Sequence, residues 1–353
     1  MNNKRILVTG GAGFMGSHIV DKLVETHNMV YAVDNFSGGF RRNVTKNLCG
    51  FFEVDLADPK ETERMIRLIK PNIIFHLAAS AREGASQFQP RHILQTNYQG
   101  FINLIVPAIS CGMEKLILFS SMSVYGNQVS PFDEILPRSP VDIYAVNKAA
   151  MEHSTEILSD IYGFQYTIFR PHNVFGVRQC LRDKYRNVAA IFMNRIMREE
   201  PLYIYGDGNQ TRSFSGIEYS LDCYIRALEL ETNQIINIGG QVPVSVNELA
   251  TVVCEAMKVS PENYPRIYIK DRPLEVKHAF TTFKKSQDLL GYNEPVDGWI
   301  NSVYKMAEWA RTMGPKEWVS DGLELTSEKT PKTWEKGFVA PSIHQIQGYA
   351  SKV

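Results

Sequence analysis

Short apolar runs alternate with segments of helical periodicity along the first half of the chain. The apolar runs predict buried parallel strands at Arg5–Thr9, Val30–Asp34, Gly50–Val54, Ile73–Leu77, Leu116–Ser120 and Tyr166–Arg170. Apolar residues at helical spacing predict helices within His18–Val24, Glu61–Ile69 and Ile93–Ser110. This alternation predicts an α/β fold with a Rossmann-type, doubly wound parallel sheet.

The pattern loosens beyond Pro171, where Gly, Pro and charged residues interrupt shorter segments. We therefore expect a Rossmann domain formed by residues 1–175 and roughly 213–240. A smaller C-terminal substrate-binding domain is expected to comprise residues 176–212 and 241–314. Residues 315–353 are rich in Lys, Ser and Thr and include Trp318 and Trp334. We expect this extension to be loosely structured and to dock through its aromatic side chains.

Composition excludes several other classes of protein. Lys plus Arg equals Asp plus Glu, at 38 each among 353 residues, so no bulk positive charge favours nucleic acid. No apolar run approaches the length of a membrane span, and the N-terminus carries no secretory signal. The five cysteines are scattered without C-x-x-C spacing and the eight histidines form no ligand cluster. We therefore expect reduced thiols, no metal and a cytoplasmic location.

A glycine-rich turn follows the first predicted strand, with Gly10, Gly13 and Gly16 at G-x-x-G-x-x-G spacing. Such glycines allow a tight turn and close approach of the backbone to a pyrophosphate at a helix N-terminus. Asp34 ends the second strand, where a carboxylate accepts hydrogen bonds from ribose hydroxyls and repels a 2′-phosphate. These residues predict NAD as the cofactor, with Asp55 and Leu56 near its adenine.

Tyr144 and Lys148 are one helical turn apart and so share a helix face. A neighbouring ammonium is expected to lower the pKa of the phenol and to make Tyr144 a general base. Ser121, after the fifth strand, is placed to hydrogen-bond the same substrate hydroxyl. Ser139 is expected to cap the helix that carries Tyr144, with Pro140 in its first turn.

With these residues, the chain resembles the extended short-chain dehydrogenase/reductase family, in its nucleotide-sugar epimerase/dehydratase branch, from about Lys4 to Arg311. The matching motifs are Thr9–Gly16, Asp34-Asn35, His76–Ala79, Asn97, Ser120–Gly126, Tyr144…Lys148, Arg170–Gly176, Tyr205–Arg212 and Arg272-Pro273. The resemblance implies that Ser121, Tyr144 and Lys148 are catalytic. It implies that NAD contacts Phe14, Met15, Asn35, Leu77, Ala78, Ala79 and Asn97 besides the residues above. It also implies that Ser121, Ser123, Asn173, Arg212 and Arg272 bind a nucleotide-diphosphate sugar, with Arg providing bidentate phosphate contacts.

Family members share oxidation of the sugar at C4 and differ in the step that follows. Dehydratases carry Asp-Glu after the catalytic Ser or Thr, and glucuronate decarboxylases carry a glutamate; here Met122 and Ser123 occupy these positions. Without those carboxylates the expected outcome is 4-epimerisation, most like that of UDP-glucose 4-epimerases. Because Ala279 is small, we hypothesise that UDP-GlcNAc and UDP-GalNAc are accepted besides UDP-glucose and UDP-galactose.

Two alternatives remain open from the sequence. The first is a 4,6-dehydratase or a glucuronate decarboxylase or epimerase on the same scaffold, using a carboxylate such as Glu83. The second is a non-catalytic NAD-binding regulatory protein, against which the retained Ser121, Tyr144 and Lys148 argue. The resemblance further implies a homodimer formed through the helices near Ile93–Ser110 and Tyr144–Ile161, although a helix buried within one chain fits the apolar pattern equally well.

Overall fold

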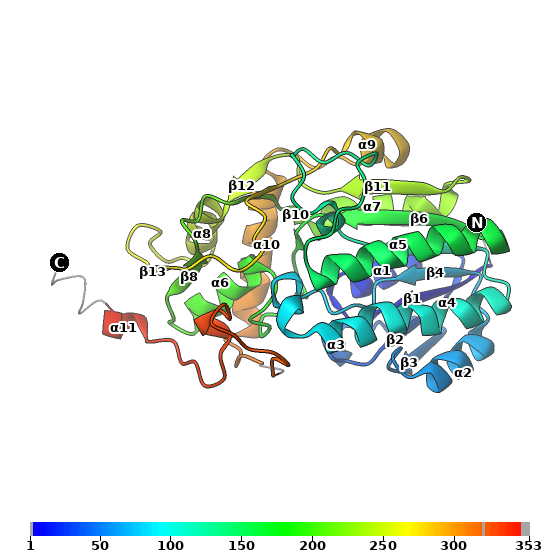
Figure 1. Ribbon diagram of the computed structural model, residues 1–353, viewed down its shortest axis with the longest axis horizontal. Helices are drawn as coiled ribbons and strands as arrows, with labels where there is room; N and C mark the ends of the chain where they lie inside the picture. Colours follow the sequence, from blue (N-terminus) through cyan, green and yellow to red (C-terminus); the bar gives the residue numbers. More distant parts are fainter. Residues whose placement is uncertain (1–2, 320–321, 347–353) are drawn as a thin grey trace.

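A seven-stranded parallel sheet forms the centre of the computed structural model, which describes residues 3–319 and 322–346 (Figure 1). Its strands lie in the order β3-β2-β1-β4-β5-β6-β11. They are β1 (Arg5–Thr9), β2 (Met29–Asp34), β3 (Gly50–Glu53), β4 (Ile73–His76), β5 (Lys115–Phe119), β6 (Gln165–Pro171) and β11 (Gln234–Ile238). The predicted α/β fold with a Rossmann-type sheet is confirmed.

The register of the sheet brings the ends of its central strands to one edge. Thr9 at the end of β1 pairs with Val33 of β2 and with His76 of β4. On the other side of β4, His76 pairs with Leu118, next to the end of β5. Because ligands bind at the carboxyl edge of such sheets, this register positions the site.

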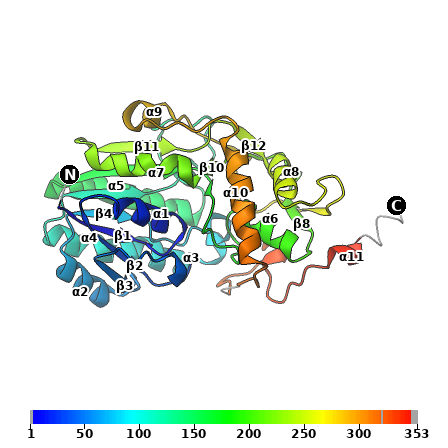
Figure 2. The same cartoon turned by 180° about the vertical axis from the view of Figure 1, so that it is seen from behind.

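Helices cover both faces of the sheet. One face packs against α2 (Pro59–Ile69), α4 (Gly100–Ser110) and α5 (Ile143–Tyr162), which lie in front of the sheet in Figure 1. The opposite face packs against α1 (Phe14–Leu23), α7 (Ile217–Arg226) and α9 (Lys284–Leu290), and Figure 2 shows α1 and α7 from that side. Burial on both faces explains why β1, β4 and β5 are almost continuously apolar.

Three details of the predicted helices are wrong. The helix expected over His18–Val24 begins at Phe14, because Gly13 already ends the turn. The segment expected as one helix over Ile93–Ser110 consists of α3 (Pro90–Ile93), a π-helical stretch η3 (Leu94–Gln99) and α4.

Asp142, and not Ser139, caps α5: its carboxylate accepts a hydrogen bond from the Ala145 N–H at 2.8 Å. Ser139 instead donates its backbone N–H to the Val124 carbonyl at 2.8 Å. Its own carbonyl packs so closely against Gly126 that a Cβ there would lie 1.9 Å away. The backbone is extended at Asp142, directly before the helix begins.

A smaller lobe is built from the segments that follow β6. Its helices are α6 (Val188–Met197), α8 (Val246–Ala256) and α10 (Gly298–Met313), and their apolar sides share one core. Its strands are β7 (Val174–Phe175), β8 (Leu202–Tyr205), β9 (Thr211–Ser213), β10 (Ser215–Gly216), β12 (Pro243–Ser245), β13 (Arg266–Ile269) and β14 (His278–Ala279). The remaining short helices are η1 (Arg41–Asn43), η2 (Glu83–Phe88), η4 (Met122–Tyr125), η5 (Ala227–Glu229), η6 (Lys332–Trp334) and α11 (Ile343–Ile346).

The C-terminal extension docks through its aromatic residues, as expected, in its described part. Trp334 is 3% exposed and packs against Phe88, Tyr185 and Tyr205. The indole N–H of Trp318 donates to the Glu200 carboxylate at 3.1 Å. Figures 1 and 2 show this segment, in red, running along the smaller lobe beside α6.

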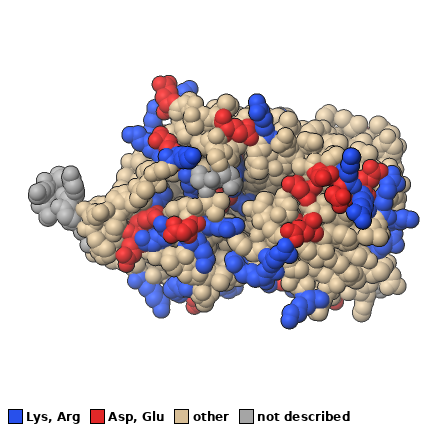
Figure 3. All heavy atoms as spheres, turned by 90° about the horizontal axis from the view of Figure 1, so that it is seen from below, with Lys and Arg blue, Asp and Glu red and all other residues tan. Residues whose placement is uncertain are grey.

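The surface bears mixed charge. On the face shown in Figure 3, basic and acidic side chains are interspersed and form no uniformly basic surface. Among the residues that the structure describes, no helix combines the length and the apolar character needed to cross a membrane.

Candidate active site

A cavity of about 440 Å³ lies between the carboxyl edge of the large sheet and the smaller lobe. Most of the predicted site residues line it. They are Gly10, Gly13, Phe14, Met15, Gly16, Asp34, Asn35, Asp55, Leu56, Leu77, Ala78, Ala79, Ser121, Tyr144, Lys148, Asn173, Arg212 and Arg272. Ser123 and Ala279 line a much smaller adjoining cavity that shares Glu83 and Arg212 with the main one. Asn97 lines neither.

The glycine turn has no room for side chains. Gly10 has a φ of +67°, and a Cβ there would lie 3.0 Å from the backbone nitrogen of Ala78. A Cβ at Gly16 would lie 2.1 Å from the Gly10 carbonyl oxygen. The turn therefore packs tightly and leaves the N-terminus of α1 facing the cavity, as binding of a pyrophosphate requires.

Asp34 stands at the wall of the cavity and is itself held in place. Its carboxylate accepts hydrogen bonds from the backbone N–H of Ala12 at 3.0 Å and of Phe36 at 2.7 Å. Burial raises the pKa of Asp34, against the lowering effect of these hydrogen bonds. A Cβ at Gly39 would lie 2.8 Å from the carboxylate, so this glycine also keeps the space beside Asp34 open.

The loop after β4 is fixed from behind by polar contacts. The Thr9 hydroxyl accepts the backbone N–H groups of Leu77 and Ala78, each at 3.1 Å. Asn97, in the π-helical stretch, accepts the Ser80 N–H at 2.7 Å and donates to the Ser80 carbonyl at 3.2 Å. Asn97 therefore holds this loop in place from outside the cavity, which is a common use of a π-helical turn near a site.

Ser121, Tyr144 and Lys148 converge as predicted. The side chains of Ser121 and Tyr144 are hydrogen-bonded to each other. The Lys148 ammonium lies 5.8 Å from the centre of the Tyr144 ring and donates to the Phe119 carbonyl at 2.7 Å. All three side chains reach the cavity from the end of β5 and the start of α5.

The expected direction of the Tyr144 pKa is wrong for the protein alone. Burial raises the pKa of Tyr144 above its ordinary value, and the negative charge of Glu83 adds to this. Burial also lowers the pKa of Lys148 to about 8, although Glu152 opposes the shift. In this state the site favours a neutral phenol, so making Tyr144 a base requires further positive charge in the cavity.

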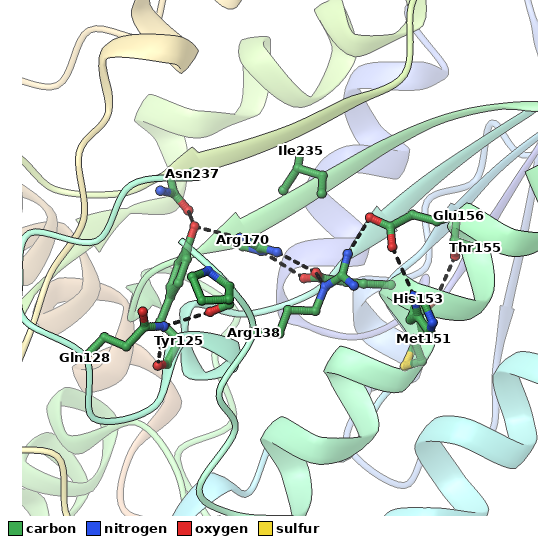
Figure 4. Close-up of polar contacts among 12 residues, drawn as sticks. Tyr125, Gln128, Arg138, Met151, His153, Thr155, Glu156, Arg170, Ile235 and Asn237 are labelled. Atoms are coloured by element: carbon green, nitrogen blue, oxygen red, sulfur yellow. Dashed lines mark hydrogen bonds and ion pairs between the residues drawn. The ribbon is translucent and has the colours of Figure 1, made fainter. Parts of the chain in front are cut away.

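A buried ionic network anchors α5 to the sheet below this site. The Arg170 guanidinium of β6 donates to the Glu152 carboxylate of α5 at 2.6 and 3.0 Å and to the Tyr125 hydroxyl at 2.8 Å. Arg138 adds a second ion pair to Glu152 at 2.8 Å. Figure 4 shows Arg170 between Tyr125 and Arg138, with Asn237 beyond the Tyr125 hydroxyl. Glu152 is two turns beyond Tyr144, so the network fixes the helix face that carries the site.

Two arginines face the cavity from the smaller lobe and share one carboxylate. Arg212 and Arg272 form ion pairs with Glu275 at 2.9 and 2.6 Å. Sequence reasoning found both arginines but missed Glu275. A signal was present in the spacing of Arg272 and Glu275, three residues apart.

Glu83, which the sequence analysis named only for the alternative reaction, also lines the cavity. Its side chain lies among Tyr144, Asp142 and the two arginines, and burial raises its pKa against their positive charge. Burial, followed by repulsion from Glu83, raises the pKa of Asp142 to about 7. Acidic groups therefore crowd this part of the cavity.

Comparison with known proteins identifies the class to which this fold and site belong. Residues 6–239 match the family described as "NAD dependent epimerase/dehydratase family". A putative UDP-glucose 4-epimerase of Methanocaldococcus jannaschii is 33% identical over 294 residues, covering 83% of this chain and 94% of the relative. UDP-glucuronic acid decarboxylase 2 of Arabidopsis thaliana is 32% identical over 83% of this chain, which spans only 65% of that relative.

Among solved structures, UDP-glucose 4-epimerase of Thermotoga maritima, determined with UDP-glucose, superposes with a TM-score of 0.81 at 32% identity. The match covers 88% of this chain and 99% of the Thermotoga chain, so this chain is the longer of the two. The chain belongs to the NAD-dependent epimerase/dehydratase family, whose members act on nucleotide sugars, and its cofactor is NAD.

Proposed function

We propose that this protein is an NAD-dependent 4-epimerase of UDP-sugars of the glucose/galactose type. The observation that carries the proposal is the convergence of Ser121, Tyr144 and Lys148 on one cavity with no carboxylate at positions 122 and 123. The cavity also runs from the glycine turn and Asp34 to Arg212 and Arg272, so it connects the residues expected to bind NAD with two cations suited to a diphosphate.

The residues of the site divide the work as follows. Tyr144 removes the proton from the sugar 4-hydroxyl and returns it at the end of the cycle. Ser121 donates a hydrogen bond to the same oxygen. The positive charge of Lys148 stabilises the phenolate form of Tyr144. When bound, NAD provides a reversible hydride acceptor for C4, and its cationic nicotinamide adds the positive charge that a phenolate needs.

Arg212, Arg272 and Asn173 are proposed to hold the nucleotide diphosphate from the smaller lobe. We also propose that the two domains bind different ligands. The NAD-binding domain comprises residues 1–175 and 213–240, and the domain that binds the nucleotide sugar comprises residues 176–212 and 241–314. The 4-ketose would then turn within the cavity, and C4 would take back on its other face the hydride first given to NAD while Tyr144 returns the proton to O4, which inverts C4.

Glu83 supports a neutral sugar over a uronic acid. A substrate carboxylate at C6 would join Glu83 and Asp142 in a cavity where burial already raises the pKa of both groups. Several carboxylates in one buried cavity repel one another unless some of them are protonated. This disfavours the decarboxylation of glucuronate on this scaffold.

The small side chain of Ala279 supports acceptance of a 2-acetamido group. Ala279 is 3% exposed and lies on β14, paired with Arg212 of β9. The adjoining cavity places it across from Ser123 and Met122. We therefore propose UDP-GlcNAc and UDP-GalNAc as additional substrates.

The test compares the wild type with Tyr144→Phe on UDP-, GDP- and dTDP-linked sugars, including UDP-glucuronic acid. We expect a UDP-hexose to give its C4 epimer by NMR with no change in mass. Tyr144→Phe should lower kcat by roughly 10²–10⁴-fold, the usual contribution of a general acid–base group, while NAD content stays unchanged. A product lighter by water or carbon dioxide would instead establish a dehydratase or decarboxylase.

A further inference from the structure

The C-terminal strap, residues 322–338, is fixed to the large-sheet lobe. The Phe88 carbonyl accepts the backbone N–H groups of Glu324 at 2.8 Å and Leu325 at 3.1 Å. The Glu324 carboxylate in turn accepts the N–H groups of Arg91 at 2.9 Å and His92 at 2.8 Å. These contacts join the strap to the segment that directly follows the loop carrying Glu83.

The strap is also fixed to the smaller lobe. The Thr333 and Tyr205 hydroxyls lie 2.6 Å apart, and Lys184 Nζ donates to the Trp334 carbonyl at 3.1 Å. Further along, the Phe338 ring packs edge-on to Tyr203 at 5.6 Å. The strap therefore bridges the two lobes across the opening between them.

Trp334 is the point where these contacts meet the cavity. Its indole packs between Phe88 of one lobe and Tyr185 and Tyr205 of the other, with ring centres 5.4 to 6.3 Å apart. Thr333 and Trp334 both line the main cavity.

Gly84 shows how closely the parts fit. A Cβ at this position would lie 3.2 Å from the Trp334 ring and 2.9 Å from the Arg272 guanidinium. The indole therefore lies beside one of the two arginines proposed to hold phosphate. Arg272 itself lies 5.2 Å above the Tyr205 ring, so the aromatic wall and the cationic group are contiguous.

We propose that the C-terminal strap is part of the nucleotide-sugar site, with Trp334 and Thr333 forming the wall that closes the cavity over the bound nucleotide diphosphate. The inference rests on the proposed function for the identity of the ligand. It assigns a binding role to residues that lie far beyond the matched family region. An apolar wall next to Arg272 excludes water from the diphosphate contacts and so strengthens them.

The test measures binding of UDP, GDP and dTDP to the NAD-loaded, full-length protein by calorimetry. We expect Trp334→Ala to weaken binding of the preferred nucleotide at least tenfold, with NAD content unchanged. Trp318→Ala is the matched control, because this tryptophan lies in the same extension and contacts Glu200 without lining the cavity. It should leave the dissociation constant within twofold of the wild type.

Trp334→Phe provides a milder variant should the alanine variant fail to fold. It keeps an aromatic ring among Phe88 and Tyr185 but shortens the wall, so binding should weaken about threefold. Unchanged binding in a folded Trp334 variant, or equal weakening in Trp318→Ala, would overturn the assignment and leave the strap a purely structural element.

The proposed function fails separately from the strap. If the wild type binds a nucleotide but epimerises no sugar, the reaction is wrong while the comparison of variants still decides the role of Trp334. If the wild type binds none of the three nucleotides, both proposals are overturned.

Discussion

We propose that the small side chain of Ala279 leaves space for the substituent at C2 of the sugar. Ala279 packs in a buried cluster with Met122, Val124, Tyr125 and Phe132. A larger side chain at this position therefore cannot simply turn outward into solvent. A side chain that projects from this position must enter either that cluster or the small cavity next to Ser123.

Replacing Ala279 with Tyr should therefore reduce turnover of UDP-GlcNAc more than turnover of UDP-glucose. We expect the ratio of the two kcat/KM values to fall by at least tenfold, because the phenol occupies the volume proposed for the acetamido group. Ala279→Ser is the control and should leave the ratio near that of the wild type. An unchanged ratio in the Tyr variant would contradict this specificity.

Site residues could be predicted from the sequence where their function depends on the spacing of neighbouring residues along the chain. Gly10, Gly13 and Gly16, and likewise Tyr144 with Lys148, are fixed by a turn or by a helix face. Glu83 was named only for the alternative reaction and Trp334 was not assigned to the site, because their place in the cavity depends on contacts between segments far apart in the sequence. The pKa of Tyr144 was mispredicted for the same reason: burial and Glu83 outweigh its helical neighbour.

Helix α5 owes its position to the charges beneath it. Glu152 is completely buried and Arg170 is 1% exposed, so each depends on the other to remain charged. Removing one partner of such a pair leaves an uncompensated charge in the interior, at a cost of about 3–5 kcal/mol.

Arg170→Met should thus destabilise the protein by roughly 3 kcal/mol or more in urea unfolding. Arg138→Met should cost less, because the Arg138 side chain is 23% exposed and leaves Arg170 paired with Glu152. The double variant Arg170→Met with Glu152→Met should recover much of the loss, since no buried charge then remains unpaired at this position. Equal destabilisation by the two single variants would argue against this account.

Hydrophobic periodicity predicted the succession of strands and helices along the first half of the chain. It did not predict where several of the helices begin. Helix α5 begins only after Asp142, whose carboxylate caps it, while the Ser139 backbone N–H bonds to the Val124 carbonyl instead. The smaller lobe was recognised only as a loosening of the pattern. Its short strands pair across long sequence distances, which local periodicity does not encode.

On the surface of the molecule, η3, α4 and α5 together form an apolar face. Large apolar side chains are about half exposed there, and they are Leu94, Val106, Val146, Ile157 and Ile161. The Tyr98 hydroxyl lies 2.9 Å from the Ser154 hydroxyl, so η3 and α5 are in contact. We propose this face as the interface of a homodimer, since exposed apolar surface of this kind is typical of an assembly site.

Ile157→Glu should convert such a dimer to a monomer. Ile157 is 46% exposed, so the substitution is tolerated in one chain but places two carboxylates in a symmetric interface. Val296→Glu, at a position 63% exposed outside η3, α4 and α5, is the control and should remain dimeric. Sedimentation velocity distinguishes the species, and a monomeric wild type would refute the proposed interface.

The path of the chain between β6 and β11 has a consequence for biosynthesis. β11 is the strand that pairs with the outer edge of β6, and residues 172–233 lie between the two strands in the sequence. During translation the ribosome must therefore synthesise α6, α7 and the strands β7 to β10 before that edge can be closed. Until then the nascent chain presents an unpaired strand, the kind of edge on which neighbouring chains aggregate. Rapid translation of residues 172–233, or binding of a chaperone to the unpaired edge of β6 in the meantime, would thus increase the yield of folded protein.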